Sequence, residues 1–387
     1  MPRAVLDMMD RRPIWAMPPW VPERIRAALP TLTYALEHGA TVILGSHLGR
    51  PKGTVNPAFT LRPVATRLAE LLGRGVVFAT AAVGNAVTEA VAQAGPGGVV
   101  LLENLRFHPG ETANDPAFAE ALAAPADCYV NDAFGSAHRA HASTTGIVHH
   151  LREAAAGLLM AAELRHLGVL LESPPRPFVA ILGGAKVSGK LEVIENLLPR
   201  IDTLLIGGAM AYTFLTARGL PVGRSLVEAA LVDATRIIER DAGQRGMRFE
   251  LPSAHVVTDR LEVGAAHETL GVEDPAIGDR LGVDIGPATV ARYAAVIADA
   301  RTIVWNGPMG VFEIDAFAPG TIAIAEAVAA SAATSIVGGG DSVAAIGRAD
   351  VGDRITHIST GGGASLEFLG GRRLPGVDAL PDAEGTE

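Results

Sequence analysis

The chain has 387 residues, 49% apolar and 19% charged, with a formal net charge of −10. This composition excludes a disordered chain, and the negative charge argues against nonspecific nucleic-acid binding. The length exceeds one ordinary core, so two domains are expected. No apolar run reaches the roughly 18 residues of a membrane span, and no signal core stands at the N-terminus, so we expect a cytoplasmic protein with no membrane partner.

The first 22 residues contain Pro13, Pro18, Pro19 and Pro22. Proline lacks the N–H that a sheet ladder needs, so we expect no regular central strand in this segment.

Beyond this segment, short apolar runs ending in Gly, Asn, Asp or His alternate with Ala-, Leu- and Glu-rich segments of helical spacing. This alternation is typical of parallel strands joined by crossover helices, so the predicted fold class is α/β. The clearest predicted strands of the first half are 41–47, 98–104 and 128–134. Cys128, the single cysteine, stands in the last of these and is expected only to pack.

Cationic side chains follow each of the three first-half strands. The carboxyl ends of parallel strands meet at one edge of a sheet, so these side chains are expected to converge. One such cation is ordinarily a solvated loop charge, but three groups in a chain of net charge −10 favour a pocket for a small, multiply charged anion. The groups are His47, Arg50 and Lys52; Arg106 and His108; and His138, Arg139 and His141.

Residues 157–173 have apolar residues at helical spacing and precede PPRP, which stops a helix. We interpret them as a connecting helix between an N-terminal domain, 1–156, and a C-terminal domain, 174–364. Residues 365–387 are expected to return toward the N-terminal domain.

Glycines, not cations, end the strands predicted in the second half. Glycine lets backbone approach a ligand closely, and a glycine turn opening a helix aims N–H groups at an anion, which predicts a nucleotide pocket. Asp341 follows one such turn and suits a phosphate-bound magnesium ion. The two halves imply two sheets. The second-half strands are 178–184, 202–208, 255–261, 302–308, 334–340 and 356–363, and the glycines are Gly183, Gly184, Gly207, Gly208, Gly307, Gly338 to Gly340 and Gly361 to Gly363.

Residues 184–191, GAKVSGKL, match a Walker A phosphate loop except that Leu191 replaces its magnesium-binding hydroxyl. A P-loop NTPase would hydrolyse ATP without an acceptor, and Leu191 argues against it. A small-anion site in one half and a nucleotide site in the other instead indicate phosphoryl transfer, which needs positioning and charge neutralisation more than a protein nucleophile. The histidines lack metal-ligand spacing, so no zinc site is expected.

The motifs together resemble phosphoglycerate kinase from about residue 23 to 380. They are GSHLGRPKG, LLENLRFHPGE, VNDAFGSAHRAHAS, ILGGAKVSGKLEVIENLL, LLIGGAMAYTFL, VWNGPMGVFE, VGGGDSVAAI and HISTGGGASLEFL. The resemblance implies reversible transfer of the acyl phosphate of 1,3-bisphosphoglycerate to Mg-ADP, giving 3-phosphoglycerate and ATP. It also implies a monomer of two Rossmann-like domains with parallel sheets, joined by a helical hinge on which they close.

The resemblance further implies roles for individual residues. Catalysis would rest on Arg24, Lys186 and Lys190, with transition-state amides from Gly361, Gly362 and Gly363, and with Asp341 toward Mg²⁺. Phosphoglycerate would be bound by Arg24, His47, Arg50, Arg106 and Arg139. ADP or ATP would be bound by Lys190, Gly207, Gly208, Gly282, Glu313, Gly339, Gly340, Asp341 and Ser342.

The first 22 residues depart from the family, which has a strand ending in Arg-x-Asp-x-Asn-Val-Pro there. Its Asp and Asn bind the glycerate part of the substrate. Their absence leaves open an alternative, a nucleotide-binding relative that has lost phosphoglycerate binding.

Overall fold

A computed structural model describes residues 3–8 and 20–382, with side chains described from residue 25 onward. The chain divides into unit 1, Met1–Arg165 with Arg373–Glu387, and unit 2, His166–Arg372. The division falls inside helix α6 (Leu158–Leu171), within the predicted connecting segment. None of the helices in these described ranges is long and apolar enough to cross a membrane.

Unit 1 is built on a six-stranded parallel sheet in the order β3-β4-β2-β1-β5-β6. The predicted strands at 41–47, 98–104 and 128–134 are confirmed as β2, β4 and β5. The strands are β1 (Arg3–Met8), β2 (Thr41–Ser46), β3 (Val77–Phe78), β4 (Val99–Leu101), β5 (Cys128–Asn131) and β6 (Ala154–Ala156). The helices are α1 (Trp20–Glu37), α2 (Arg62–Leu72), α3 (Asn85–Ala94), α4 (Pro109–Ala113), α5 (Pro116–Ala123) and α14 (Pro375–Asp378).

Strand β2 shows why the strands of this sheet are continuous apolar runs in the sequence. Every one of its residues is buried. Ile43 packs in a core with side chains of α3 and α5, whereas Val42 and Leu44 pack in a second core with α1 and α2. Successive side chains point to opposite faces of a strand, so a parallel sheet covered on both faces needs apolar residues at every position.

Strand β1 corrects the expectation that the first 22 residues contain no central strand. Residues Arg3–Met8 pair with β2 on one side and β5 on the other, in the middle of the sheet. Pro13, Pro18 and Pro19 lie beyond this strand and outside the described residues, as does Trp15; Pro22 lies in α1. The proline rule holds, because β1 itself contains no proline: Pro2 precedes it in the sequence and the other prolines follow it.

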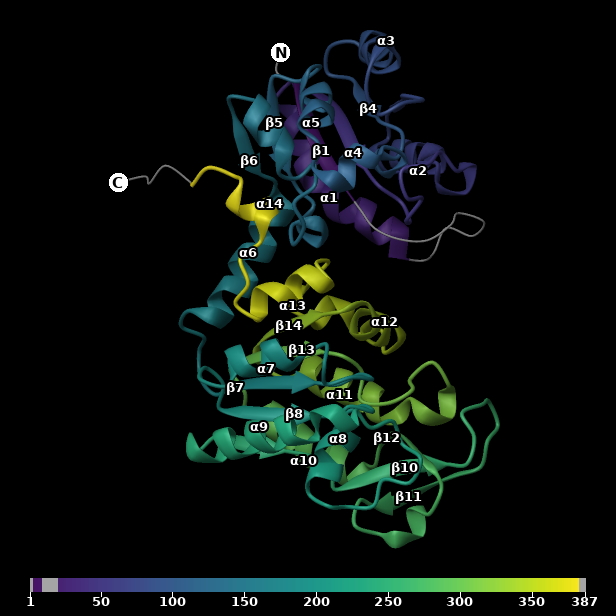
Figure 1. Ribbon diagram of the computed structural model, residues 1–387, viewed down its shortest axis with the longest axis vertical. Helices are drawn as coiled ribbons and strands as arrows, with labels where there is room; N and C mark the ends of the chain where they lie inside the picture. Colours follow the sequence, from purple (N-terminus) through teal and green to yellow (C-terminus); the bar gives the residue numbers. More distant parts are fainter. Residues whose placement is uncertain (1–2, 9–19, 383–387) are drawn as a thin grey trace. The chain divides into compact units, whose positions relative to one another are not determined.

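Unit 2 is built on a second six-stranded parallel sheet, in the order β15-β14-β13-β7-β8-β9. Figure 1 shows β14, β13, β7 and β8 side by side in that order. The predicted strands are confirmed as β7, β8, β13, β14 and β15. The strands are β7 (Phe178–Leu182), β8 (Thr203–Ile206), β9 (Arg248–Glu250), β13 (Thr302–Asn306), β14 (Thr334–Gly338) and β15 (His357–Ile358). The helices are α7 (Leu191–Leu197), α8 (Ala211–Ala217), α9 (Val232–Gln244), α10 (Pro287–Ala298), α11 (Pro319–Ala330), α12 (Gly340–Arg348) and α13 (Gly363–Leu369).

A three-stranded antiparallel sheet also belongs to unit 2, so the expectation of two sheets was wrong. Its order is β11-β10-β12, from β10 (Ala254–Thr258), β11 (His267–Gly271) and β12 (Leu281–Ile285). The strand predicted at 255–261 is β10, which joins this sheet and not the large parallel one.

Candidate functional site

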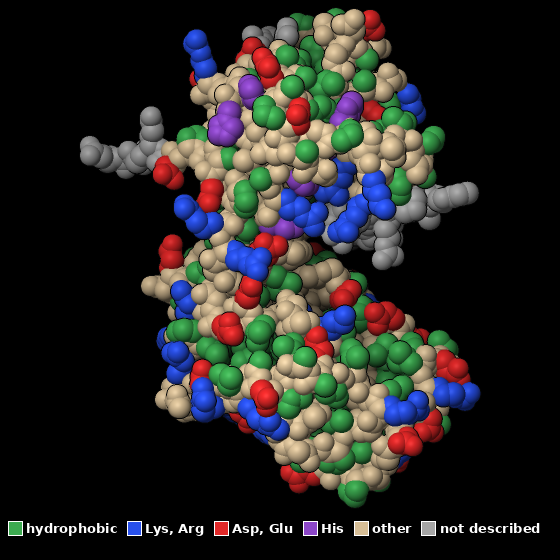
Figure 2. All heavy atoms as spheres, viewed as in Figure 1, with side chains coloured by type: hydrophobic (Ala, Val, Ile, Leu, Met, Phe, Trp, Pro, Cys, Tyr) green, Lys and Arg blue, Asp and Glu red, His purple; other side chains and the backbone are tan. Residues whose placement is uncertain are grey.

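The carboxyl edge of the unit 1 sheet brings three of the predicted cations together. β2 ends at Ser46, directly before His47; β4 precedes the turn that carries Arg106; and β5 precedes the loop with Arg139. His47 and Arg106 are buried, and Arg139 is half-buried. Figure 2 shows Lys and Arg side chains, with histidines among them, gathered along one edge of unit 1.

The pKa of His141 indicates how much positive charge lies at this edge. Burial and, next to it, the charges of Arg106, His47, Arg139 and His138 together lower its pKa to about 3. His141 is therefore neutral at pH 7, and the other four groups lie close enough to affect it. The site suits a polyanion, which would offset the repulsion among these cations.

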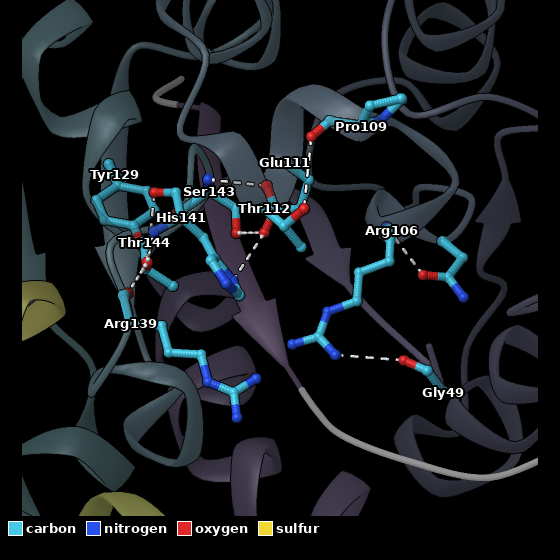
Figure 3. A network of polar contacts seen from close by, with 11 residues as sticks. Gly49, Arg106, Pro109, Glu111, Thr112, Tyr129, Arg139, His141, Ser143 and Thr144 are labelled. Carbon is cyan, nitrogen blue, oxygen red and sulfur yellow. Dashed lines mark hydrogen bonds and ion pairs between the residues drawn. The ribbon is translucent and has the colours of Figure 1, made fainter. Parts of the chain in front are cut away.

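The guanidinium groups of Arg106 and Arg139 are held differently (Figure 3). Arg106 is 6% exposed and donates from Nη1 to the carbonyl oxygen of Gly49 at 3.3 Å. The Arg139 guanidinium makes no hydrogen bond or ion pair with any described residue, which leaves its donors available. Arg50 is exposed next to Gly49, and Arg24 lies in α1, where its side chain is not described.

Unit 2 contains a cavity of about 200 Å³ at the carboxyl ends of β7, β8 and β13. Four predicted nucleotide residues line it, Gly208, Gly282, Glu313 and Asp341. Gly184, one of the strand-end glycines expected at the nucleotide pocket, lines it as well. Sequence reasoning missed the rest of the lining: Ala185, Ala209, Ala211, Tyr212, Pro252, His255, Val283, Asp284, Ile285, Pro308, Met309, Gly310 and Val311.

The strand-end glycines near this cavity serve close backbone packing more than anion binding. Gly183, Gly184, Gly207 and Gly208 all donate their amides to backbone carbonyls. Gly208 has φ +64°, and a Cβ there would overlap the backbone nitrogen of Gly184. The expectation that these amides are free for a ligand was therefore wrong for this group, although the requirement for glycine is real.

Free amides occur instead at the start of α12. The backbone N–H groups of Gly340, Asp341 and Ser342 make no hydrogen bond within the described residues, as expected for the first turn of a helix. The Ser342 hydroxyl is engaged, because it accepts a hydrogen bond from Gly307 N at 2.6 Å. This helix start is suited to phosphate oxygens.

Lys190 lies next to this helix start and is half-buried. Its Nζ donates to Asn306 Oδ1 at 2.8 Å, and Asn306 Nδ2 donates to the carbonyl of Gly338 at 2.9 Å. Burial lowers the pKa of Lys190 to about 8, and the Asp341 carboxylate opposes that shift. Asn306 thus links Lys190 to the glycine turn. Sequence reasoning missed Asn306, because a single amide side chain at the end of a strand is not part of a recognisable motif.

Lys186 is exposed, and the loop around it is fixed by Glu228. The Glu228 carboxylate accepts hydrogen bonds from Val187 N, from Ser188 N at 3.1 Å and from Ser188 Oγ at 2.6 Å. These bonds, with the charge of Lys186, hold the pKa of Glu228 below its usual range despite some burial. Leu191 begins α7 and is half-buried, as expected for a residue that packs and does not bind metal.

Tyr212 and His255 form one wall of the cavity. The Tyr212 hydroxyl lies 3.1 Å from His255 Nδ1, and burial lowers the pKa of His255 to about 4, so the tyrosine is hydrogen-bonded to a neutral imidazole. A Cβ at Gly282 would overlap the Tyr212 hydroxyl. Gly282 is therefore required here by the tyrosine that packs on it.

Asp284 is 4% exposed, and burial raises its pKa to about 7 although the Gly320 and Ile285 amides oppose the rise. Oδ2 accepts from Gly320 N at 2.6 Å, at the start of α11, while Oδ1 has no hydrogen-bond partner among the described residues. Side chains at Gly310 or Gly320 would overlap this carboxyl group. Asp284 thus fixes β12 against α11, and it leaves no room for a side chain at Gly310 in the neighbouring loop.

Of the three predicted transition-state glycines, Gly361 is engaged within the protein. Its amide donates to Ser359 Oγ at 3.2 Å. The amides of Gly362 and Gly363, at the start of α13, make no hydrogen bond within the described residues.

Asp341 is exposed and lines the cavity, and its carboxylate lies close enough to Lys190 to oppose the lowering of that lysine's pKa. In the described ranges, no group of three or more His, Cys, Asp or Glu side chains forms a metal site. One carboxylate facing a phosphate site fits Mg²⁺, which keeps several waters and takes substrate oxygens as ligands.

Comparison with known proteins gives a single family. The phosphoglycerate kinase family model matches residues 21–372. Among curated relatives, phosphoglycerate kinase of Koribacter versatilis is 56% identical over 364 residues, covering 92% of this chain and 90% of the relative. That of Solibacter usitatus is 58% identical over 358 residues, with 92% and 90% covered.

Solved structures agree with this result. The phosphoglycerate kinase of Coxiella burnetii has a TM-score of 0.84 and 40% identity, covering 98% of this chain and 96% of that one. The enzyme of Pyrococcus horikoshii has a TM-score of 0.85 and 34% identity over the same shares. The family model spans both the edge of unit 1 and the cavity of unit 2, and the chain belongs to the phosphoglycerate kinase family.

Proposed function

We propose that this member of the family transfers the acyl phosphate of 1,3-bisphosphoglycerate to Mg-ADP through the residues described above. The single observation that carries this assignment is the pairing of Lys190 and Asn306 beside the free amides of α12, because it is a ready phosphate site. In the transfer, the bond between phosphorus and the acyl oxygen breaks and a bond to a terminal ADP oxygen forms.

The cationic edge of unit 1 is proposed to bind phosphoglycerate. Arg106 and Arg139 present planar guanidinium groups, which suit phosphate and carboxylate oxygens, and His47 and Arg50 lie on the neighbouring strand end. Arg24 joins this set by its position in the family motif and would act on the transferring group.

The cavity of unit 2 is proposed to bind ADP or ATP. Gly207, Gly208 and Gly282 would lie beside the base and Glu313 near the ribose, while Gly339 to Ser342 with Lys190 would hold the phosphates. Lys186, Lys190 and the amides of Gly362 and Gly363 would stabilise charge on the phosphoryl oxygens in the transition state. Mg²⁺, held on the protein side by Asp341, would neutralise nucleotide phosphate charge.

We further propose a cytoplasmic monomer in which binding of both ligands closes the domains and excludes water. The relatives named above as phosphoglycerate kinase do not support the alternative of a nucleotide-binding relative without activity. The Walker A alternative is disfavoured because Leu191 begins a helix and offers no hydroxyl.

The test measures ADP formation from ATP with and without 3-phosphoglycerate. We expect saturable turnover that requires 3-phosphoglycerate and Mg²⁺. ATP binding of ordinary affinity with no saturable response to 3-phosphoglycerate would refute the assignment. ATP hydrolysis without 3-phosphoglycerate would instead support the alternative that the protein is a P-loop NTPase.

A further inference from the structure

Glu111 is a buried carboxylate that the proposed reaction does not use. It lies in α4, 1% exposed, beside the cationic edge of unit 1. Oε2 accepts from Ser143 N at 3.1 Å, Oε1 accepts from Ser143 Oγ at 2.7 Å, and His141 Nδ1 lies 3.6 Å from Oε1 (Figure 3). One side chain thus contacts two residues of the loop that begins at Arg139.

Backbone bonds strengthen the same junction. Ala142 N donates to the carbonyl oxygen of Glu111 at 3.0 Å. Tyr129 Oη donates to the Ser143 carbonyl at 2.8 Å, and Thr144 Oγ1 donates to the Arg139 carbonyl at 3.2 Å. The 139–144 loop is therefore fixed on one side by β5 and on the other by Glu111.

Each of the two joined segments carries a guanidinium of the phosphoglycerate site. Arg106 and Glu111 lie on consecutive turns, connected by hydrogen bonds from His108 N to Leu105 O and from Glu111 N to His108 O. Arg139 stands two residues before His141 on the other segment. The Glu111 carboxylate is consequently a link through which the spacing of Arg106 and Arg139 is set.

We propose that Glu111 is a positioning residue for phosphoglycerate: it holds the loop of Arg139 at a fixed distance from Arg106, so that both guanidinium groups meet one substrate anion. The inference rests on the proposed function of the cationic edge. It extends that function to a residue that touches no substrate.

Electrostatics and positioning predict opposite effects for the loss of this charge. Glu111 faces His141, around which His47, Arg106, His138 and Arg139 cluster. If Glu111 acted only through its charge, its removal would strengthen binding of an anion at this edge. If it positions the loop, its removal weakens binding in spite of the favourable change in charge. The sign of the change in affinity therefore separates the two roles.

The experiment compares the wild type with Glu111→Gln, Ser143→Ala and the double variant in the full chain. We expect Glu111→Gln to raise KM for 3-phosphoglycerate about tenfold and Ser143→Ala about threefold, with KM for ATP changed by less than about twofold. The double variant should lose less than the product of the two single effects, because both remove one junction.

Asp115→Asn is the matched control. Asp115 lies four residues after Glu111 and caps α5 through Phe118 N at 2.8 Å, but within the described residues it makes no hydrogen bond with the 139–144 loop. Asn caps a helix about as well as Asp, so Asp115→Asn should remove the same charge as Glu111→Gln with little loss of stability and with no change in KM for 3-phosphoglycerate. If the wild type is active and Glu111→Gln has an unchanged or lowered KM for 3-phosphoglycerate, the inference about Glu111 is wrong. If the wild type itself is inactive, the proposed function is wrong. Should Glu111→Gln fail to fold, Ser143→Ala decides on the same criterion.

Discussion

The two units use the same kind of sheet but present it to a ligand in different ways. In unit 1, cations follow β2, β4 and β5, and long side chains reach the open edge. In unit 2, glycines follow β7, β8, β13 and β14, backbone segments pack against one another, and the half-buried Lys190 supplies the charge beside the glycine turn. One site is made of side chains, and the other mostly of backbone.

The difference determines how strongly single substitutions weaken ligand binding at each site. A side-chain site weakens by increments as single cations are removed, because each contributes its own hydrogen bonds. A backbone site does not tolerate an added methyl group where two backbone segments are in contact. Among the described residues, Lys190 has no neighbouring cation that could replace it in this site. The predictions below test this contrast.

Lys190→Ala should have the largest effect. It removes the cation of the unit 2 phosphate site, and loss of such a group costs on the order of 10² to 10⁴ in kcat. Steady-state kinetics measure this effect, and circular dichroism should show a folded chain. Near-normal kcat would contradict both the role of Lys190 and the contrast between the units.

The pH dependence of Lys190 gives a second readout of the same prediction. Since burial lowers its pKa to about 8, the free enzyme loses this charge as pH rises through 8, and kcat/KM for the nucleotide should fall there. Lys190→Arg stays charged, so it should lack this fall even if it is slower. The alkaline limb of the pH profile distinguishes the two.

Arg139→Ala should raise KM for 3-phosphoglycerate about 10- to 100-fold, because a charge-assisted hydrogen bond is worth about 1.5 to 3 kcal/mol. KM for ATP should stay constant. Arg139→Lys keeps the charge but not the planar fork, so an intermediate KM is expected. Equal loss of affinity for both substrates would show that the two sites are not separable in this way.

Gly282→Ala should raise KM for ATP by about five- to twentyfold, since the new methyl group displaces the Tyr212 ring toward the cavity. Gly347→Ala is its control, because that glycine lies in α12 with nothing within 4 Å of a Cβ. If both variants bind ATP normally, backbone packing does not limit the unit 2 site.

Much of this fold is predictable because buried parallel strands have a strong sequence signal. The FVAIL run of β7 and the TVILGS run of β2 are buried throughout and end at glycine or histidine. The small antiparallel sheet was missed because the two partners of β10 lack that signal: β11 is largely exposed, and β12 includes Gly282 and Asp284 among its five residues.

The site was predictable where residue type carries the chemistry. Arg106 and Arg139 follow predicted strands, so their place at the edge of the unit 1 sheet could be predicted from position, whereas Lys190 precedes α7 and was assigned only through the family motif. Asn306 and Glu111 act through tertiary contacts with residues distant in sequence, 116 positions away for Asn306 and Lys190. A single amide or carboxylate in a loop does not reveal such a contact before the chain is folded.

The Asp284 carboxyl group couples folding of unit 2 to the acidity of the medium. The side chain has an ordinary pKa of 3.8, which burial raises to about 7. Between these two values the folded chain holds a proton that the unfolded chain has released, so folding takes up a proton from solvent. With respect to this group, unit 2 is most stable below about pH 4 and loses that stabilisation as pH rises toward 7. The carboxyl group of Asp284, which lines the nucleotide cavity, is therefore about half protonated near pH 7 in the protein without ligands.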